Sequence, residues 1–144
     1  MNPQLLARVG AAGCLAASGV IHAQLYLTGY RSIPGIGSAF LLQASGSFAV
    51  ALLLLLSSAA VLRLAAAALA AGAMMGFIAS RTVGVLGFVE YGLLPAPQAL
   101  ISVLVEATAL GLLAVALHDR RSARFAGGGR GARPPRDVLA QPAD

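Results

Sequence analysis

Five polar side chains stand out because they interrupt otherwise apolar stretches of the sequence. They are an imidazole, a phenol, an amide, a guanidinium and a carboxyl group, at His22, Tyr26, Gln43, Arg81 and Glu106. Polar and ionisable groups in apolar surroundings are costly, so they usually gather inside a helix bundle and pair with one another. Gathered in one pocket, these groups would bind a small ligand, an ion or a partner subunit. Their spacing assigns none of them as a catalytic residue or a metal ligand.

Helical spacing places these residues on shared faces. Residues four apart lie on the same side of a helix, one turn above one another. Three sets show this spacing: Ser18, His22 and Tyr26; Gln43 and Ser47; and Ser102 and Glu106. Glu106 is the costliest, because a carboxylate more than one turn inside hydrocarbon must be neutral or paired. We expect it to pair with Arg81 or His22, or to be protonated and hydrogen-bonded to a neighbour.

The composition makes lipid the main solvent of the chain. Hydrophobic residues make up 58% of the 144 residues and charged residues 10%, and the mean hydropathy is +0.83. Four apolar stretches are long enough to cross a hydrocarbon core of about 30 Å as helices. They run from Leu5 to Leu27, Ser38 to Ser57, Leu62 to Ser80 and Ala99 to Leu117. We therefore predict an all-α fold, a four-helix transmembrane bundle formed by residues 1–118.

A tail rich in Arg, Gly and Pro follows the last apolar stretch. Residues 119–144 cannot bury enough apolar area to offset the entropy of ordering, so we predict a disordered cytoplasmic tail. Most of the arginines lie in this segment and dominate the net charge of +5. A basic tail beside a membrane span typically sets topology or contacts anionic headgroups, so we predict the lipid bilayer as a partner and no nucleic acid.

Arginine placement predicts the orientation, because cytoplasmic flanks of membrane spans carry an excess of basic residues. With four crossings, Arg8, Arg63 and the basic tail fall on one side, and Arg31 and Arg81 fall on the other. We therefore expect a multi-pass protein of the bacterial inner membrane with both termini cytoplasmic. A cleavable signal peptide ending near Ala23 is an alternative that would leave three spans.

The same topology brings the polar side chains to one depth. At about 1.5 Å per residue, His22, Gln43 and Glu106 lie roughly one to two turns inside the outer boundary, whereas the inner halves of the spans are apolar. We therefore predict a polar pocket that opens to the outer face. The loop from Thr82 to Gln98, whose only charged residue is Glu90, would fold back over this pocket as a lid.

Most of these residues also have a structural interpretation. Tyr26 would anchor its helix at the interface, Gln43 would hydrogen-bond a neighbouring helix, and Arg81 would reach the outer headgroups. The third span carries small residues at every fourth position, which predicts close helix packing within the bundle or between subunits. These residues are Ala68, Gly72, Gly76 and Ser80.

Metal and haem sites have weaker support. A haem between helices usually needs two axial ligands at one depth, and the second histidine, His118, lies at the inner boundary. A copper site built from His22, Cys14 and a methionine would have suitable ligand softness, but Cys14 lies two turns below His22. We therefore assign no metal site, and the sequence names no cofactor.

One stretch resembles a block in an uncharacterised family of small actinobacterial integral membrane proteins. It runs from His22 to Gly37 and continues from Phe40 to Gln43, and a later stretch from Val83 to Glu90, with Glu106, is similar to the same family. The resemblance covers residues 5–117 and implies a four-helix bundle in a Gram-positive inner membrane. It implies no activity. The four-span plan is also loosely similar to that of the DoxX-like proteins.

Three functional hypotheses follow from these observations. The leading one is a non-enzymatic membrane protein whose outer-side polar pocket binds a small ligand, an ion, or a partner subunit such as a second copy of the chain. The alternative is an accessory component of a membrane redox system, in which His22, Tyr26 and Glu106 would contact a quinone or relay protons. The third is a bundle whose polar groups serve packing alone.

Overall fold

The computed structural model describes residues 2–128, with side chains described for residues 2–118. The long helices are α1 (Pro3–Thr28), α2 (Ile36–Leu56), α3 (Ala60–Thr82) and α4 (Gln98–Gly128), and a short 3-10 helix, η1, covers Tyr30–Ser32. Within the described residues, these four helices are long and apolar enough to cross a membrane. The predicted all-α, four-helix transmembrane bundle is therefore confirmed.

The helix ends follow the hydropathy pattern. The predicted first three spans match α1, α2 and α3 to within two residues at each end. The fourth helix begins one residue before its predicted start and continues past Leu117 to Gly128. Residues 119–128 of the predicted tail therefore belong to α4, and residues 129–144 lie outside the described residues.

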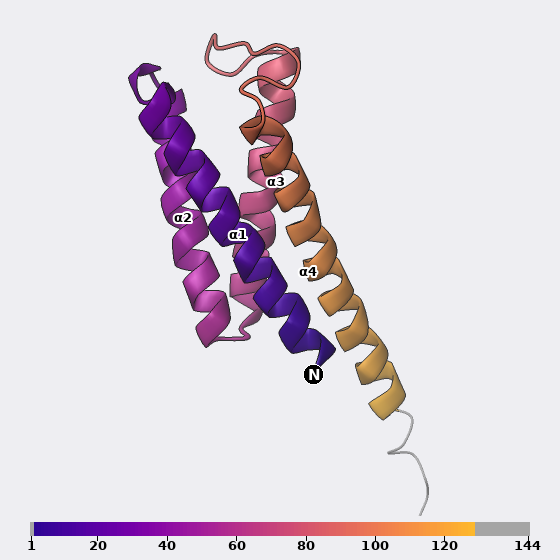
Figure 1. The fold of residues 1–144 in the computed structure, drawn as a ribbon. Helices are drawn as coiled ribbons and strands as arrows, with labels where there is room; N and C mark the ends of the chain where they lie inside the picture. Colours follow the sequence, from indigo (N-terminus) through magenta and orange to yellow (C-terminus); the bar gives the residue numbers. More distant parts are fainter. Residues whose placement is uncertain (1, 129–144) are drawn as a thin grey trace, which may run out of the picture.

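The helices form a ring in chain order. α1 packs chiefly against α2 and α4, α3 contacts the same two helices, and α2 and α4 do not touch within the described residues. Figure 1 shows α1 lying across the front, between α2 and α4, with α3 behind it. The start of α1 and the end of α4 lie at one end of the bundle, as four crossings require (Figure 1). The opposite end, which carries η1 and residues 83–97, is called the loop end below.

The bundle is apolar on its outside, and its buried polar groups gather in one half. Large aliphatic side chains point outward, as lipid-facing residues do: Leu42, Leu56 and Leu64 are 71%, 75% and 68% exposed. The half away from the loop end has an apolar core, formed by Ala11, Ala12, Leu15, Ala51, Leu54, Ala66 and Leu113. The half nearer the loop end buries Ser18, His22, Ser80, Ser102 and Glu106. The predicted division between a polar half and an apolar half is therefore present among the described residues, and the side of the membrane that each half faces stays a prediction.

A tight corner joins α1 to α2 and sets the height of the α2 side chains. After η1, α2 begins at Ile36, and the N–H of its second residue, Gly37, donates to the Ile33 carbonyl at 3.0 Å. A Cβ atom added at Gly37 would lie 2.8 Å from the carbonyl oxygen of Arg31 and 2.9 Å from that of Tyr30. Because both are backbone atoms, a side chain at this position would push the corner apart.

Gly37→Ala should therefore destabilise the bundle. We expect the free energy of unfolding to fall by roughly 1–3 kcal/mol, the usual cost of overpacking a site. Thermal unfolding in detergent, followed by circular dichroism, measures the change. Gly13→Ala is the matched control, because a Cβ atom there meets no atom within 4 Å. A midpoint for Gly37→Ala equal to that of Gly13→Ala would contradict this view of the corner.

Candidate functional site

A cavity of about 180 Å³ lies between the helices at the loop end. All four long helices contribute to its wall, and so does the outer loop, defined here as residues 83–97. From the outer loop come Val85, Phe88, Glu90 and Pro95. The outer loop therefore lies where a lid is expected, because it folds back over the bundle and closes one side of the cavity.

Three of the five predicted pocket residues line this cavity, namely His22, Gln43 and Arg81. Glu106 lies behind the wall, where it is 2% exposed and contacts the wall residue Ser102. Tyr26 lies one turn beyond His22 on α1, is partly exposed, and does not belong to the wall. The structure thus brings four of the five residues into one region and leaves Tyr26 outside it.

His22 offers the cavity a hydrogen-bond acceptor. Its Nδ1 lies 2.9 Å from the carbonyl oxygen of Ser18, one turn earlier on α1. A carbonyl oxygen only accepts, so the hydrogen must sit on Nδ1, and the Nε2 of a neutral ring then carries a bare lone pair. The described residues make no hydrogen bond to Nε2. An unused acceptor nitrogen therefore remains on a wall residue.

Glu106 ties α4 to α1 through hydroxyl groups. Its Oε1 accepts from Ser102 Oγ at 2.9 Å and from Ser18 Oγ at 3.2 Å. The expected ion pair with Arg81 or His22 is wrong, since within the described residues Arg81 pairs with Glu90 and no ion pair includes Glu106; the hydrogen bonds to neighbours follow the other predicted alternative. Arg81 occupies the last turn of α3, whereas Glu106 lies more than two turns into α4. The guanidinium instead meets a nearer carboxylate.

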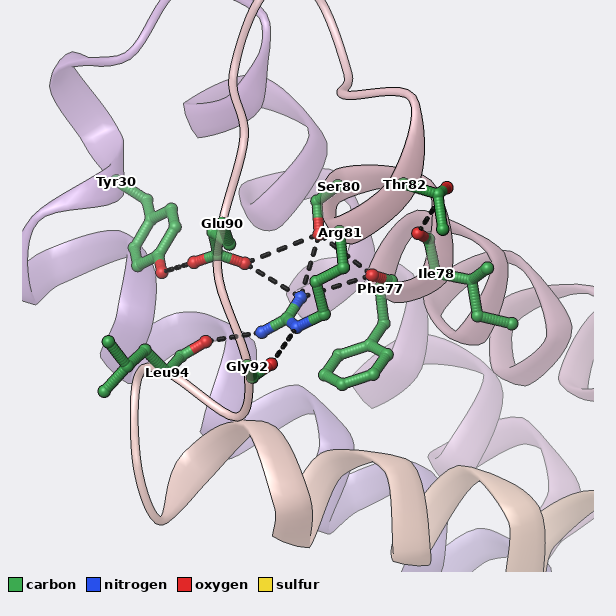
Figure 2. Close-up of polar contacts among 9 residues, drawn as sticks. All are labelled: Tyr30, Phe77, Ile78, Ser80, Arg81, Thr82, Glu90, Gly92 and Leu94. Atoms are coloured by element: carbon green, nitrogen blue, oxygen red, sulfur yellow. Dashed lines mark hydrogen bonds and ion pairs between the residues drawn. The ribbon is translucent and has the colours of Figure 1, made fainter.

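Arg81 fastens the outer loop to the bundle (Figure 2). Its Nε donates to the Gly92 carbonyl at 2.6 Å, its Nη2 to the Leu94 carbonyl, and its Nη1 to Glu90 Oε2 at 3.0 Å. The guanidinium also lies over the Phe77 ring, 3.7 Å from the ring centroid. Its side chain is only 12% exposed. Arg81 therefore binds the loop, and the expectation that it reaches outward to headgroups is wrong.

Glu90 connects this cation to the corner between α1 and α2. Its Oε1 accepts from the Tyr30 hydroxyl, and its backbone N–H donates to the Ser80 carbonyl at 2.9 Å (Figure 2). Burial raises the pKa of the Tyr30 phenol, and the hydrogen bond to Glu90 and the charge of Glu90 raise it further, against the charge of Arg81. The hydroxyl therefore stays protonated at neutral pH and remains a donor to the carboxylate.

Aromatic rings form much of the wall beneath the loop. The Tyr30 ring stacks on Phe40 with centroids 4.6 Å apart and meets the edge of Phe88 at 5.8 Å. The His22 ring lies 5.3 Å from Phe40 at a tilted angle. Rings from α1, η1, α2 and the outer loop therefore pack as one cluster, which supports the loop from below.

The small-residue stripe of α3 faces the cavity. Gly72, Gly76 and Ser80 line the wall, and a Cβ atom added at Gly72 or Gly76 would meet no atom within 4 Å. The predicted close helix packing within the bundle is therefore wrong at these two glycines. Both glycines are exposed, so no neighbouring helix among the described residues covers α3 at these two positions.

Several wall residues, including Tyr30 and Phe40, were not among the predicted pocket residues. One signal was available for the lid contact: Glu90 is the only carboxylate in the outer loop, and Arg81 lies close before it in the sequence. The rings carried no such signal, because aromatic residues near a membrane boundary are common for other reasons.

Comparisons with known proteins do not assign the site. No protein-family model, curated protein or solved structure matches the chain. The resemblance to small actinobacterial membrane proteins and to the DoxX-like plan therefore stays a prediction. Within the part of the chain described, no group of three or more His, Cys, Asp or Glu side chains is placed to hold a metal ion. Functional inference rests on the geometry of the cavity.

Arg81→Gln should release the outer loop. Hydrogen bonds to charged groups contribute about 1.5–3 kcal/mol each, so we expect amide hydrogen exchange in residues 83–97 to become at least about tenfold faster. Exchange measured by mass spectrometry in detergent reports this directly. Arg31→Gln is the matched control, because Arg31 is an exposed arginine at the same end. Unchanged exchange in Arg81→Gln would show that the loop is held by its apolar contacts alone.

Substitutions of Glu106 should separate hydrogen bonding from ion pairing. Glu106→Gln keeps an oxygen that accepts from both serines, whereas Glu106→Leu leaves the Ser18 and Ser102 hydroxyls without that acceptor. We expect Glu106→Leu to lose roughly 2 kcal/mol more of unfolding free energy than Glu106→Gln. Adding Ser18→Ala and Ser102→Ala to Glu106→Leu should recover part of this loss. Equal losses for Gln and Leu in thermal unfolding would argue against the serine contacts.

Proposed function

We propose that this protein is an integral membrane binding protein that takes a small, largely apolar molecule into the cavity beneath the outer loop. The observation that carries the proposal is the cavity itself, about 180 Å³ with mainly apolar walls and a few polar groups. Ligand sites are typically concave and apolar, with a small number of polar atoms that orient the ligand. Roughly 150 Å³ is enough for a benzene-sized molecule. A compound with one ring therefore fits.

The glycines of α3 favour binding over packing as the purpose of this space. Each glycine in a helix interior costs about 1 kcal/mol relative to alanine. A methyl group at Gly72 or Gly76 would meet open space, so alanine would fit at both positions without a clash. Gly13 also meets open space, on the outside of α1, so the support comes from the place of Gly72 and Gly76 on the cavity wall, where larger side chains would reduce the volume.

A role beside a membrane redox system is the second candidate, and one observation favours it. His22 and Ser102 line the cavity and are joined through Ser18 and Glu106 by hydrogen bonds. Such a chain exchanges protons locally. Deeper in the bundle the core consists of alanine and leucine side chains, among them Leu15, so within the described residues the chain gives no route to the other end. This limits the proton-relay hypothesis to the outer half.

The orientation is part of the proposal. Arg8 and Arg63 line a small pocket at the end opposite the outer loop, and the sequence of α4 adds Arg120, Arg121 and Arg124 beyond its apolar stretch. An excess of basic residues at one end is typical of the cytoplasmic side. The cavity would then face the outer leaflet of a bacterial inner membrane. A partner subunit or a second copy of the chain would add to this arrangement but is not needed to form the cavity.

Binding of toluene tests the proposal. We expect saturable heat of binding when toluene is titrated into the purified protein in detergent, beyond that of protein-free micelles. Gly76→Leu should fill the cavity and weaken binding at least about tenfold, as loss of a buried ring's contacts implies. Gly13→Leu, at an open position on the outside of α1, should bind as the unmodified protein does. The proposal is wrong if toluene does not bind saturably, or if Gly76→Leu leaves its binding unchanged.

A further inference from the structure

The polar side chains of the cavity wall donate most of their hydrogens to the protein itself. Arg81 donates from all three of its nitrogens, to the outer loop and to α3. The wall hydroxyls are committed in the same way: Tyr30 to Glu90, Ser80 to the Phe77 carbonyl at 2.9 Å, and Ser102 to Glu106 at 2.9 Å. One N–H of Arg81 Nη2 has no acceptor among the described residues, so a ligand that needs more than this single donor would have to break existing contacts.

Gln43 follows the same pattern. Its amide nitrogen donates to the carbonyl oxygen of Leu69 at 3.2 Å and to Ser47 Oγ at 3.5 Å. Because the Leu69 carbonyl only accepts, the nitrogen must face it, and this settles which end of the amide is which. The described residues make no hydrogen bond to Oε1. The free group of this wall residue is again an acceptor.

His22 supplies the second free acceptor. The Ser18 carbonyl holds the hydrogen on Nδ1, and Nε2 is left without a partner among the described residues. Besides one N–H of Arg81 Nη2 and the spare lone pairs of groups that already have partners, this wall therefore carries two acceptor atoms with no partner among the described residues, one on α1 and one on α2. A cation would satisfy them too, but the Arg81 guanidinium on the same wall opposes a second positive charge.

We propose that the ligand is a small ring compound with a hydroxyl group, which donates to His22 Nε2 with Gln43 Oε1 as the second acceptor. This inference rests on the proposed function. A ring whose polar atoms are only carbonyl or ether oxygens would be buried against these acceptors with no hydrogen between them. Burying an unsatisfied polar group costs about 1–3 kcal/mol, so the wall selects hydroxyl-bearing rings over acceptor-only rings of equal size.

The same preference for hydroxyl groups would distinguish the two forms of a quinone, which is the ligand of the redox alternative. An oxidised quinone ring carries only acceptor oxygens, whereas its reduced form carries two hydroxyl groups. The wall would therefore discriminate in favour of the reduced form, and the protein would act as a binder of the hydroxylated ring. This preference needs no change in the protonation of any wall residue.

Paired titrations with toluene, phenol and anisole test the inference, because these rings differ in carrying a methyl, a hydroxyl or a methyl ether group. Each is titrated calorimetrically into the full protein in detergent against protein-free micelles. The quantity compared between variants is the ratio of the phenol to the toluene binding constant, since differences in solubility cancel. His22→Phe keeps a ring and removes Nε2, and should lower this ratio about three- to tenfold. Tyr26→Phe, off the cavity wall, should leave it unchanged.

Each result of these titrations supports or contradicts either the hydroxyl preference or the proposed function. A fall of the ratio in His22→Phe, with anisole behaving like toluene, supports the inference. Gln43→Leu gives a second arm if His22→Phe does not fold, with a fall of the ratio again expected. A ratio unchanged in every folded variant, while toluene still binds, overturns the hydroxyl preference and leaves the proposed cavity function standing. If neither toluene nor phenol binds saturably, the proposed function itself fails.

Discussion

The contacts of Arg81 hold the loop end of the structure together. One guanidinium joins the last turn of α3 to three points of the outer loop, at Glu90, Gly92 and Leu94. Through the Glu90 carboxylate the same network reaches Tyr30, at the corner between α1 and α2. The loop therefore closes over the cavity because its own carbonyl groups are the acceptors of a cation that the bundle buries.

The limited supply of water near a membrane explains the chemistry of the cavity wall. Polar groups at this depth must find partners within the protein, and the helices provide them locally. Ser80 and His22 donate to carbonyl oxygens of their own helices, and Ser18 and Ser102 donate to Glu106. These side chains carry more acceptor lone pairs than donor hydrogens. When the hydrogens are used within the protein, some acceptor atoms therefore have no partner among the described residues. The polarity of the site follows from this surplus.

The cavity exists because side chains fill the centre of the bundle in one half and not in the other. Away from the loop end, Leu15, Leu54 and Leu113 fill the centre of the bundle. Towards the loop end, Gly72 and Gly76 of α3 line the cavity and are exposed, and no side chain fills the space beside them. The aromatic cluster around Phe40 then supports the loop without occupying the centre. A volume of ring size is left where the polar groups lie.

Hydropathy and helical spacing alone determined the number of helices, most of their ends, the half of the bundle in which the polar residues lie and the shared helix face of Ser102 and Glu106. These properties depend only on length along a helix axis, which sequence spacing specifies. Partners on different elements, Ser18 for Glu106 and Glu90 for Arg81, were decided only by the tertiary structure. Hydropathy places a residue in depth but does not specify how each helix is rotated about its axis or how a loop returns. That rotation is set by packing between helices, and it carried Tyr26 off the wall and turned the glycines towards the cavity.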